Sequence, residues 1–374
     1  MLLTITLAAC GSSSSNTGST GSSGDGSSGA SQGSGDSGAL LAEAKAAVAK
    51  AEQEPTVIGA ASLGSFKPAP GGFFYYVSCD ESIVGCKVIA DAVQQGTEAL
   101  GYKFESCNAG ATAQGTSNCM KSALDAKPSV VLMGGIDAAD SQGGYAALQR
   151  AGIPIVGVDT GNAPGTTAGE VGGYCAAQAK QIADALIADA NGNAKVLMLA
   201  SNFTACTRER DAAFKAEYQR LCPGCELDVV DFDVATMVQS LPGQIQAALV
   251  QHPGITGIYA VIDQATSIAV TAVQQAGKSN SIVATGFDAN PANVQLIRQG
   301  KVQKYDESSA QGETGWASAD MAARVYSKVK VPKVSVPNVY LIDPNTVGAI
   351  TNSMNMWLGT PDYETQFKKL WGQG

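Results

Sequence analysis

Two carboxylates stand at matching places in this chain, each at the end of a short apolar segment. Asp159 ends the run Ile153-Pro-Ile-Val-Gly-Val-Asp159, and Asp288 ends the run Ser281-Ile-Val-Ala-Thr-Gly-Phe-Asp288. β-Branched runs that stop at Gly, Asn and Pro are typical of buried parallel strands, and open α/β sheets bind ligands beyond the carboxyl ends of their strands. The two acids therefore predict two α/β units that face one crevice. For either Asp alone, a helix N-cap is the alternative role.

Other predicted strand ends carry the donors, acceptors and aromatic surface that a site for a small polar molecule needs. These further residues are Asp80, Glu81, Thr160, Arg210, Phe232, Asp263 and Ser308. Arg210 lies at the start of a predicted helix, where the helix dipole does not stabilise a cation, so a ligand or an acidic partner across the cleft would explain it. A solvated arginine paired with Glu209 or Asp211 is the alternative.

Groups that could catalyse a reaction are scarce. His252 is the only histidine, and it lies in a helix-ending turn where a surface or capping role suits it better than that of a general base. Gly277-Lys278-Ser279 resembles the end of a phosphate-binding loop, but Ala272 replaces the required upstream glycine and a helix precedes it. Pairs of acids could hydrolyse glycosides only at a fixed separation, which the sequence does not indicate. We therefore predict no catalytic residue and no cofactor.

An alternation of strands and helices must position these residues. The predicted strands are 73–77, 102–107, 130–133, 153–159, 170–171, 195–200, 227–232, 257–262, 282–285 and 339–342. The predicted helices are 39–54, 84–100, 112–126, 140–151, 174–190, 207–221, 235–251, 264–276, 291–299, 312–329 and 361–371. This βαβ order requires parallel sheets with right-handed crossovers. The first helix is expected to be a stalk or packing helix, and the last to carry an apolar packing face.

Composition limits the classes of function. The 374 residues, 45% of them hydrophobic, can bury a large core, and the length predicts two or three folding units. A net charge of −9 and the lack of a basic patch argue against a nucleic-acid partner, because such binding relies on Lys and Arg that neutralise phosphates. No segment reaches the roughly 18 apolar residues of a membrane-spanning helix, so we expect a soluble body.

The amino terminus has features of an export signal. The segment Leu7-Ala8-Ala9-Cys10 follows a short apolar run and resembles the bacterial lipoprotein signal, in which the cysteine becomes the lipidated first residue. The run is short and no Lys or Arg precedes it, as in a truncated signal. Residues 11–38 are almost wholly Gly and Ser and predict a flexible linker. We therefore expect a signal in residues 1–10 and lipid attachment at Cys10.

The cysteines support export. Nine are present, and setting aside Cys10 leaves eight, an even number that is typical of disulfides formed in an oxidising compartment. Although eight cysteines allow about 105 pairings, proximity in the sequence suggests Cys79–Cys86, Cys107–Cys119 and Cys222–Cys225, which leaves Cys175–Cys206. A zinc site is the alternative for Cys222-Pro-Gly-Cys225, but no second Cys-x-x-Cys or His pair accompanies it. We predict no metal site.

Several short segments occur in an order that resembles a known family. They are Leu100-Gly-Tyr102, Gly152-Ile-Pro-Ile-Val-Gly-Val-Asp159, Thr207-Arg-Glu-Arg210 with Phe214, Asp231-Phe232-Asp233, Gln251-His-Pro253, Ile262-Asp263, Gly286-Phe-Asp288 and Gly300-Lys301. From about residue 72 to residue 345, the set is similar to the type I periplasmic solute-binding proteins of the ribose-binding branch, which deliver sugars to ABC importers.

The resemblance implies an α/β fold of two Rossmann-like lobes with parallel sheets, joined by three hinge crossings near Gly172, Ser309 and Asn338. It implies a first lobe of residues 72–171 plus 309–338 and a second of 172–308 plus 339–350. A stalk helix and lead-in would occupy 39–71, and a helical tail 351–374.

The resemblance also implies roles for individual residues. Asp159 and Asp288 match acids that hydrogen-bond sugar hydroxyls, Arg210 matches a sugar-binding arginine, and Phe232 matches an aromatic that packs on the sugar ring. These four positions imply a ligand held between the lobes.

Three other positions depart from the ribose branch. Thr160 replaces a second arginine, Ile262 replaces an asparagine, and Ser308 replaces a glutamine. The loop Ser78–Cys86, with Asp80 and Glu81, replaces the usual Asn-Pro-aromatic-aromatic segment by a disulfide loop. These departures favour a less polar ligand, with an apolar or aromatic part.

The expected function is therefore solute capture outside the cytoplasm. The closed lobes would be presented to the permease of an ABC transporter, and a lipid on Cys10 would anchor an otherwise soluble monomer to the cell membrane. Alternatives are a sensory receptor of the same fold that feeds a signalling protein, and a secreted hydrolase. A repressor of the same fold would carry an amino-terminal helix-turn-helix, where this chain has a signal and a Gly/Ser tract.

Overall fold

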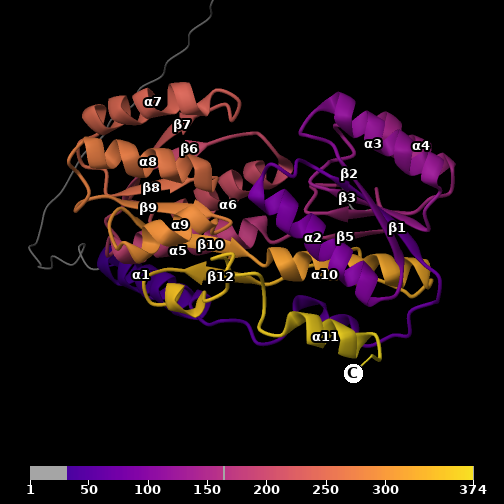
Figure 1. Ribbon diagram of the computed structural model, residues 1–374. Helices are drawn as coiled ribbons and strands as arrows, with labels where there is room; N and C mark the ends of the chain where they lie inside the picture. The colour runs from indigo at the N-terminus through magenta and orange to yellow at the C-terminus, as the bar shows by residue number, and fades with distance from the viewer. Residues whose placement is uncertain (1–31, 163–164, 374) are drawn as a thin grey trace, which may run out of the picture.

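The computed structural model describes residues 32–162 and 165–373, which form two α/β lobes side by side (Figure 1). The strand order is β11-β5-β4-β3-β1-β2 in the first sheet and β12-β10-β9-β8-β6-β7 in the second. All neighbouring strands are parallel except β10 and β12, which are antiparallel. The α/β fold class expected from the sequence is confirmed.

The first lobe alternates its apolar side chains between two covered sheet faces. Its strands are β1 (Phe73–Ser78), β2 (Lys103–Asn108), β3 (Val130–Gly134), β4 (Ile155–Val158), β5 (Gly169–Val171) and β11 (Val334–Ser335). Its helices are α2 (Val84–Ala99), α3 (Ala113–Ala126), α4 (Gln142–Arg150) and α10 (Gln311–Tyr326). Phe74 and Tyr76 pack under α2 and α10, whereas Tyr75 and Val77 pack under α3 and α4. Burial on both faces explains the continuous apolar strands.

The second lobe has one core that runs through both faces of its sheet. Its strands are β6 (Lys195–Ala200), β7 (Glu226–Asp231), β8 (Gly257–Ala260), β9 (Val283–Phe287), β10 (Gln303–Ser309) and β12 (Val339–Ile342). Its helices are α5 (Cys175–Asp189), α6 (Ala205–Leu221), α7 (Met237–Gln251), α8 (Asp263–Gln275) and α9 (Pro291–Arg298). The sequence analysis did not predict β10, because this strand is polar although almost all of it is buried.

Connections between the lobes fall into two groups. Three join β5 to α5, β10 to α10 and β11 to β12, close to the expected hinge positions. Two more lie outside them, at residues 52–58 and 351–362. The first leads from α1 (Gln32–Ala51) on the second lobe to the 3-10 helix η1 (Gly59–Leu63) on the first. The second ends in α11 (Tyr363–Leu370), which packs on α10 of the first lobe (Figure 1).

One expectation about the ends of the chain needs correction. Helix α1 begins at Gln32, inside the tract expected to be a flexible linker. Of the two roles expected for this helix, a stalk or a packing helix, the structure has the packing helix, because Ala44 is buried in the core of the second lobe. The apolar face predicted for the C-terminal helix is a packing face, with Trp371 stacked on Trp316 at 5.5 Å between ring centroids. The expected signal and Cys10 lie outside the described residues.

No helix in residues 32–162 and 165–373 combines the length and the apolar character needed to cross a bilayer.

Candidate ligand-binding cleft

The two strand-end acids have the same local geometry in the two lobes. Asp159 follows β4 with φ of 52°, and Asp288 follows β9 with φ of 88°, both in the left-handed region that side chains other than glycine rarely adopt. In each case the backbone N–H donates to the neighbouring strand: Asp159 to Val171 at 2.7 Å, and Asp288 to Glu307 at 2.9 Å. Such strained turns persist at functional sites when the surrounding structure holds them.

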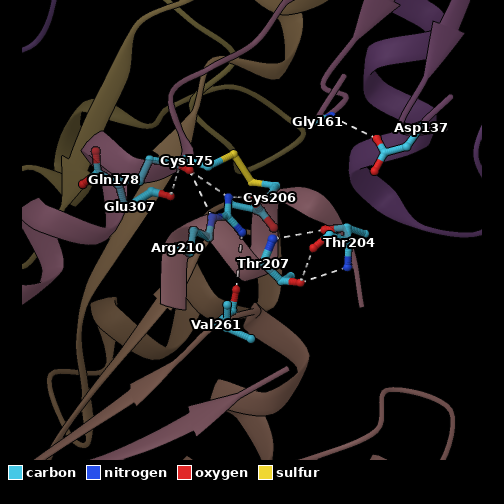
Figure 2. Close-up of a disulfide and its surroundings, with 11 residues drawn as sticks. Asp137, Gly161, Cys175, Gln178, Thr204, Cys206, Thr207, Arg210, Val261 and Glu307 are labelled. Carbon is cyan, nitrogen blue, oxygen red and sulfur yellow. Dashed lines mark hydrogen bonds and ion pairs between the residues drawn. A yellow bond between two sulfur atoms is a disulfide. The ribbon is translucent and has the colours of Figure 1, made fainter. Parts of the chain in front are cut away.

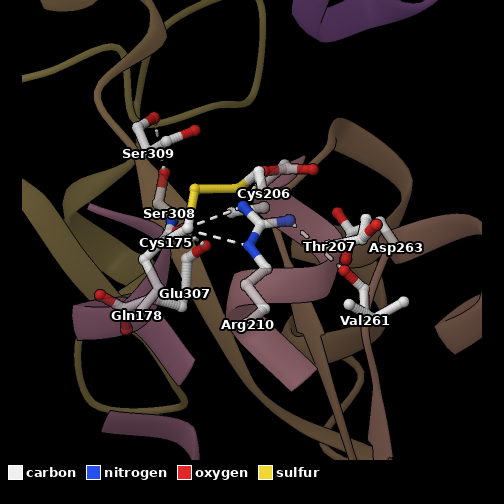
Figure 3. Close-up of polar contacts among 12 residues, drawn as sticks. Cys175, Gln178, Cys206, Thr207, Arg210, Val261, Asp263, Glu307, Ser308 and Ser309 are labelled. Atoms are coloured by element: carbon white, nitrogen blue, oxygen red, sulfur yellow. Dashed lines mark hydrogen bonds and ion pairs between the residues drawn. A yellow bond between two sulfur atoms is a disulfide. The ribbon is translucent and has the colours of Figure 1, made fainter. Parts of the chain in front are cut away.

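Arg210 is buried at the centre of the second-lobe half of the cleft (Figure 3). Its Nε and Nη2 donate to Gln178 Oε1 at 3.2 and 2.8 Å, and its Nη1 donates to the Val261 carbonyl at 3.3 Å. Nη2 also forms an ion pair with Asp288 at 2.8 Å, and the guanidinium lies over the Phe287 ring. The alternative of a solvated arginine is wrong, because Arg210 has an acidic partner within its own lobe.

The Cys175–Cys206 disulfide lies beside Arg210 (Figure 2). Cys175 is three residues before Gln178 on α5, and Cys206 is four residues before Arg210 on α6. Residues three and four apart lie on one face of a helix, so the disulfide and the Gln178–Arg210 hydrogen bonds form two successive links between these helices. A carboxylate oxygen of Asp159 and both sulfurs lie within 4.8 Å of one another. The oxidised sulfurs are not metal ligands, so this trio is a contact between the lobes.

A second buried group of acids lies behind Asp288. Asp263 and Asp306 are each 1% exposed or less, and their carboxyls face one another beneath Gly286. Burial and the opposing carboxyl raise the pKa of Asp263 well above its usual range, so the pair shares a proton. A Cβ on Gly286 would lie 2.3 Å from Asp263 Oδ1, which explains the glycine in the Gly-Phe-Asp segment. Asp263 Oδ2 accepts the backbone N–H of Asn290 at 2.7 Å and fixes the loop after β9.

Glu307 on β10 is fully buried on the other side of the sheet, towards α5. Gln178 Nε2 donates to its carbonyl at 3.4 Å, and the amide of Gln181 lies against its carboxyl at 2.7 Å. Burial raises the pKa of Glu307 well above its usual range, and the nearby Asp306 adds to this. A neutral Glu307 therefore supports α5, whose Gln178 accepts two hydrogen bonds from Arg210.

Several residues expected to bind a ligand make contacts within the protein instead. Thr160 Oγ1 donates to Glu170 at 2.5 Å, and Ser308 is completely buried, with its hydroxyl directed at the Trp357 carbonyl at 3.4 Å. Phe232 is 7% exposed and packs in the second-lobe core. Asp263 belongs to the buried acid pair described above. The sequence showed where each strand ends, but it does not show which way each side chain turns.

Other expected residues remain accessible at strand ends. Asp80 and Glu81 are half-buried in the loop closed by the Cys79–Cys86 disulfide. Asp80 Oδ1 accepts the backbone N–H of Ser82 at 2.9 Å, while no contact engages the Glu81 carboxylate among the described residues. Ile262 is half-buried at the start of α8.

Tyr76, Tyr174 and Asp137 were missed by the sequence analysis. Tyr76 is 1% exposed, yet its hydroxyl has no hydrogen-bond partner in the part of the chain that the structure describes. The carboxylates of Asp159 and Glu81 lie close enough to add to the effect of burial and raise its pKa. Tyr174 lies beside Asp159, whose pKa is raised by burial and lowered by Arg210. Tyr76 lies within an apolar strand and Tyr174 in the turn before α5, and neither position shows in the sequence where the hydroxyl is directed.

The lobes touch at the rim of the cleft. Gly161 approaches α6 so closely that a Cβ there would lie 2.0 Å from Ala205 Cβ. Asp137 accepts the Gly161 backbone N–H at 2.9 Å (Figure 2). It also lies 4.0 Å from Arg208 of the second lobe. Acids at the ends of both sheets are therefore brought together, as the matched segments predicted.

The disulfide pairing and the position of the histidine both follow the sequence analysis. The structure contains Cys79–Cys86, Cys107–Cys119, Cys175–Cys206 and Cys222–Cys225, the four pairs expected. His252 ends α7 and lies 3.0 Å from Asp228 on the surface, a capping position as expected.

A family model described as "Periplasmic binding protein domain" matches residues 74–328. The chain belongs to the periplasmic binding protein family. This result agrees with the resemblance drawn from the ordered segments, and it leaves α1, η1 and α11 outside the matched region. No curated protein matches the chain.

Solved structures show the same fold. A 5-methylthioribose transporter solute-binding protein from Thermotoga lettingae has a TM-score of 0.69 at 17% identity, over 83% of this chain and 100% of that one. The glucose-galactose binding protein GanP from Geobacillus stearothermophilus has a TM-score of 0.67 at 19% identity, over 74% and 99%. An ABC transporter solute-binding protein from Agrobacterium vitis with bound allitol has a TM-score of 0.68 at 18% identity, over 75% and 98%. At these identities the likeness establishes the fold and no ligand.

Proposed function

We propose that this protein is the extracytoplasmic solute-binding component of an ABC importer, which captures a sugar or a less polar sugar-like compound between its lobes. The observation that carries this proposal is the meeting of Asp159 from the first lobe with the Arg210–Asp288 pair of the second. A ligand that contacts both sides is satisfied only when the lobes close, so its binding energy favours the closed state. The closed lobes would then dock on a membrane permease.

The same proposal includes the location of the protein outside the cytoplasm. A lipid on Cys10 would anchor a monomer to the cell membrane, and four disulfides suit an oxidising compartment. The solved relatives described above include proteins whose names give sugar or polyol ligands, which supports the ligand class.

Binding is tested by thermal shift and calorimetry with D-ribose, D-glucose, D-galactose, D-allose, allitol and 5-methylthioribose. We expect at least one of them to raise the melting temperature of the full chain. Asp159→Ala should abolish that rise and leave the fold intact, because Asp159 forms no ion pair among the described residues. The matched control is Asp125→Asn, an exposed acid on α3, which should keep the full rise. No stabilisation by any compound, or an unchanged rise in Asp159→Ala, would contradict the proposal.

Arg210→Ala should also abolish ligand binding, but with a clear cost in stability. Removing one partner of a buried ion pair leaves the other uncompensated and costs about 3 kcal/mol, and Asp288 is 28% exposed, which reduces that cost. Urea unfolding measures the difference. Equal stability of Arg210→Ala and Asp159→Ala would show that the ion pair does not hold the cleft together.

The alternatives give different results in the same experiments. A secreted hydrolase would convert the bound compound, which NMR of the recovered ligand would reveal. A sensory receptor would bind without turnover, and its gene would lie beside a signalling protein in place of a permease.

A further inference from the structure

We propose that the first-lobe half of the cleft binds an ammonium group, and that the solute is an amine-bearing polyol such as an amino sugar. This inference rests on the solute-binding function proposed above and specifies the chemistry of its ligand.

The first step is that the expected hydrogen-bond donors of the cleft are already used. Arg210 directs four of the five N–H groups of an arginine at Gln178, Val261 and Asp288. Thr160 donates to Glu170. Ser308 turns away from the cleft, as described above. A ligand whose main demand is for donors, such as a carboxylate or phosphate, would find few of them here.

The second step is that acceptors remain. Arg210 pairs with Asp288 and offsets its charge, but no Lys, Arg or His forms an ion pair with Asp159 among the described residues. Asp137 has the exposed Arg208 at 4.0 Å. Asp159 is therefore a half-buried carboxylate without an ion-pair partner of its own, and the charge of Arg210 offsets only part of the cost of its burial. A cationic ligand would supply the missing partner.

A third and independent observation is the unpartnered Tyr76 hydroxyl. It lies at the carboxyl end of the first sheet, where a Cβ on Gly134 would come within 2.0 Å of it. Asp159 and Glu81 lie near it on the loops that follow β4 and β1. The residue is 1% exposed and its hydroxyl bonds to no described residue, so a ligand that reaches it would supply a partner that the protein does not.

These groups together fit one chemical group. A primary ammonium has three donors and no acceptor, and it can bond to the carboxylates of Asp159 and Glu81 and to the Tyr76 oxygen at once. The remaining hydroxyls of an amino sugar would reach Asp288 and the last Arg210 N–H in the second lobe.

Matched ligand pairs test the inference, because neutral sugars can also hydrogen-bond to acids. Calorimetry at pH 7 on the full chain compares D-glucosamine with D-glucose, and D-galactosamine with D-galactose. N-acetyl-D-glucosamine provides a neutral nitrogen at the same position, and D-glucuronate provides an anion. We expect at least one amine to bind roughly tenfold or more tightly than both its hydroxyl and its N-acetyl counterpart. Glucuronate should not bind.

Two outcomes overturn the inference and separate it from the proposed function. If a neutral sugar binds as tightly as its amine, the ammonium site is wrong and solute binding stands. If no amine binds, the inference fails, and the neutral panel described above decides whether the solute-binding function fails with it.

Variants locate the ammonium site. Asp159→Asn and Glu81→Gln should each reduce the amine-to-hydroxyl preference to near one, because each removes a negative charge that the ammonium group would bind. Glu81 is half-buried in a loop, so Glu81→Gln should fold normally. It therefore still tests the site if Asp159→Asn does not fold. Tyr76→Phe should lower the preference severalfold, and the Asp125→Asn control should retain it. An unchanged preference in both carboxylate variants would place the amine elsewhere and overturn the proposal.

Discussion

Buried carboxyl groups dominate the chemistry of the second lobe at the scale of single residues. Burial raises the pKa of Asp211 to about 6 and that of Asp306 to about 6. Asp263 and Glu307 are shifted further in the same direction. Neutral carboxyls can donate as well as accept, which lets them join strands and helices without a buried charge.

Asp184 offers the clearest test of such a buried acid. It is 5% exposed on α5, and burial, with Glu217 as the nearest acid, raises its pKa to about 7. The folded pKa lies above the unfolded value of about 3.9, so the native state binds this proton more tightly. Its contribution to stability is complete below pH 4 and is lost as the pH rises to 7.

Asp184→Asn removes this titration. We therefore expect the variant to be more stable than the parent at pH 8, by at most about 1.4 kcal/mol for each pH unit between the two pKa values, and nearly equal at pH 4.5. Urea unfolding across this range measures it. Asp228→Asn, on the surface beside His252, should show no such gain. A gain at pH 4.5 as large as that at pH 8 would refute the charge argument.

Residue types predicted which residues lie near the cleft better than they predicted the contacts between those residues. Asp159, Asp288 and Arg210 could be found because strand ends and helix starts are visible in the apolar pattern. The tyrosines and the acid pair could not be found, because their roles depend on side-chain directions and on partners distant in the sequence. Asp263 and Asp306 meet across 43 residues of chain, and neither segment contains a sign of the other.

At the scale of elements, β10 shows why one strand escaped prediction. Its sequence Gln303-Lys-Tyr-Asp-Glu-Ser-Ser309 has the polarity of a surface loop, yet its neighbours β9 and β12 bury it. Its polar groups find partners on adjacent helices: Asn293 donates to Gln303, Gln178 donates to the Glu307 carbonyl, and the Gln181 amide lies against the Glu307 carboxyl. Prediction from hydropathy assumes that buried strands are apolar, and here hydrogen bonds take the place of apolar burial.

The Cys175–Cys206 disulfide joins α5 and α6 one turn before the Gln178–Arg210 contact. The Cys175→Ala/Cys206→Ala protein should therefore bind its best ligand from the neutral panel at least severalfold more weakly, because Arg210 loses its alignment with Gln178. It should also lose about 3 to 4 kcal/mol of stability, since the bond closes a loop of sequence separation 31.

The Cys222–Cys225 disulfide is the matched control, because it lies in the same lobe away from the cleft, with a separation of 3. Cys222→Ala/Cys225→Ala should retain the affinity and lose less stability. Calorimetry and urea unfolding measure both quantities. Equal affinity in the two double variants would show that the cleft disulfide has no positioning role.

At the scale of the whole molecule, the two connections outside the hinges, at residues 52–58 and 351–362, contact each other and α10. Glu313 at the start of α10 is fully buried and accepts the N–H groups of Gly59 at 2.8 Å and Thr360 at 3.1 Å. Trp357 Nε1 donates to Glu54 at 3.0 Å and joins the two connections to each other. Opening of the lobes must stretch or release these contacts, so we expect the two connections to limit how far the lobes open.

Cutting one connection tests this limit without removing packed residues. A protease site inserted between Ser353 and Met354, in an exposed part of the 351–362 connection, leaves both cut ends packed on their lobes. After cleavage, we expect the radius of gyration of the ligand-free protein to increase in small-angle X-ray scattering, while that of the ligand-bound protein stays the same. Affinity should fall, because a more favourable open state competes with closure. The same insertion between Ser279 and Asn280, in a loop within the second lobe, is the control and should change neither quantity. Identical scattering of the cut and uncut proteins without ligand would show that the hinges alone set the opening.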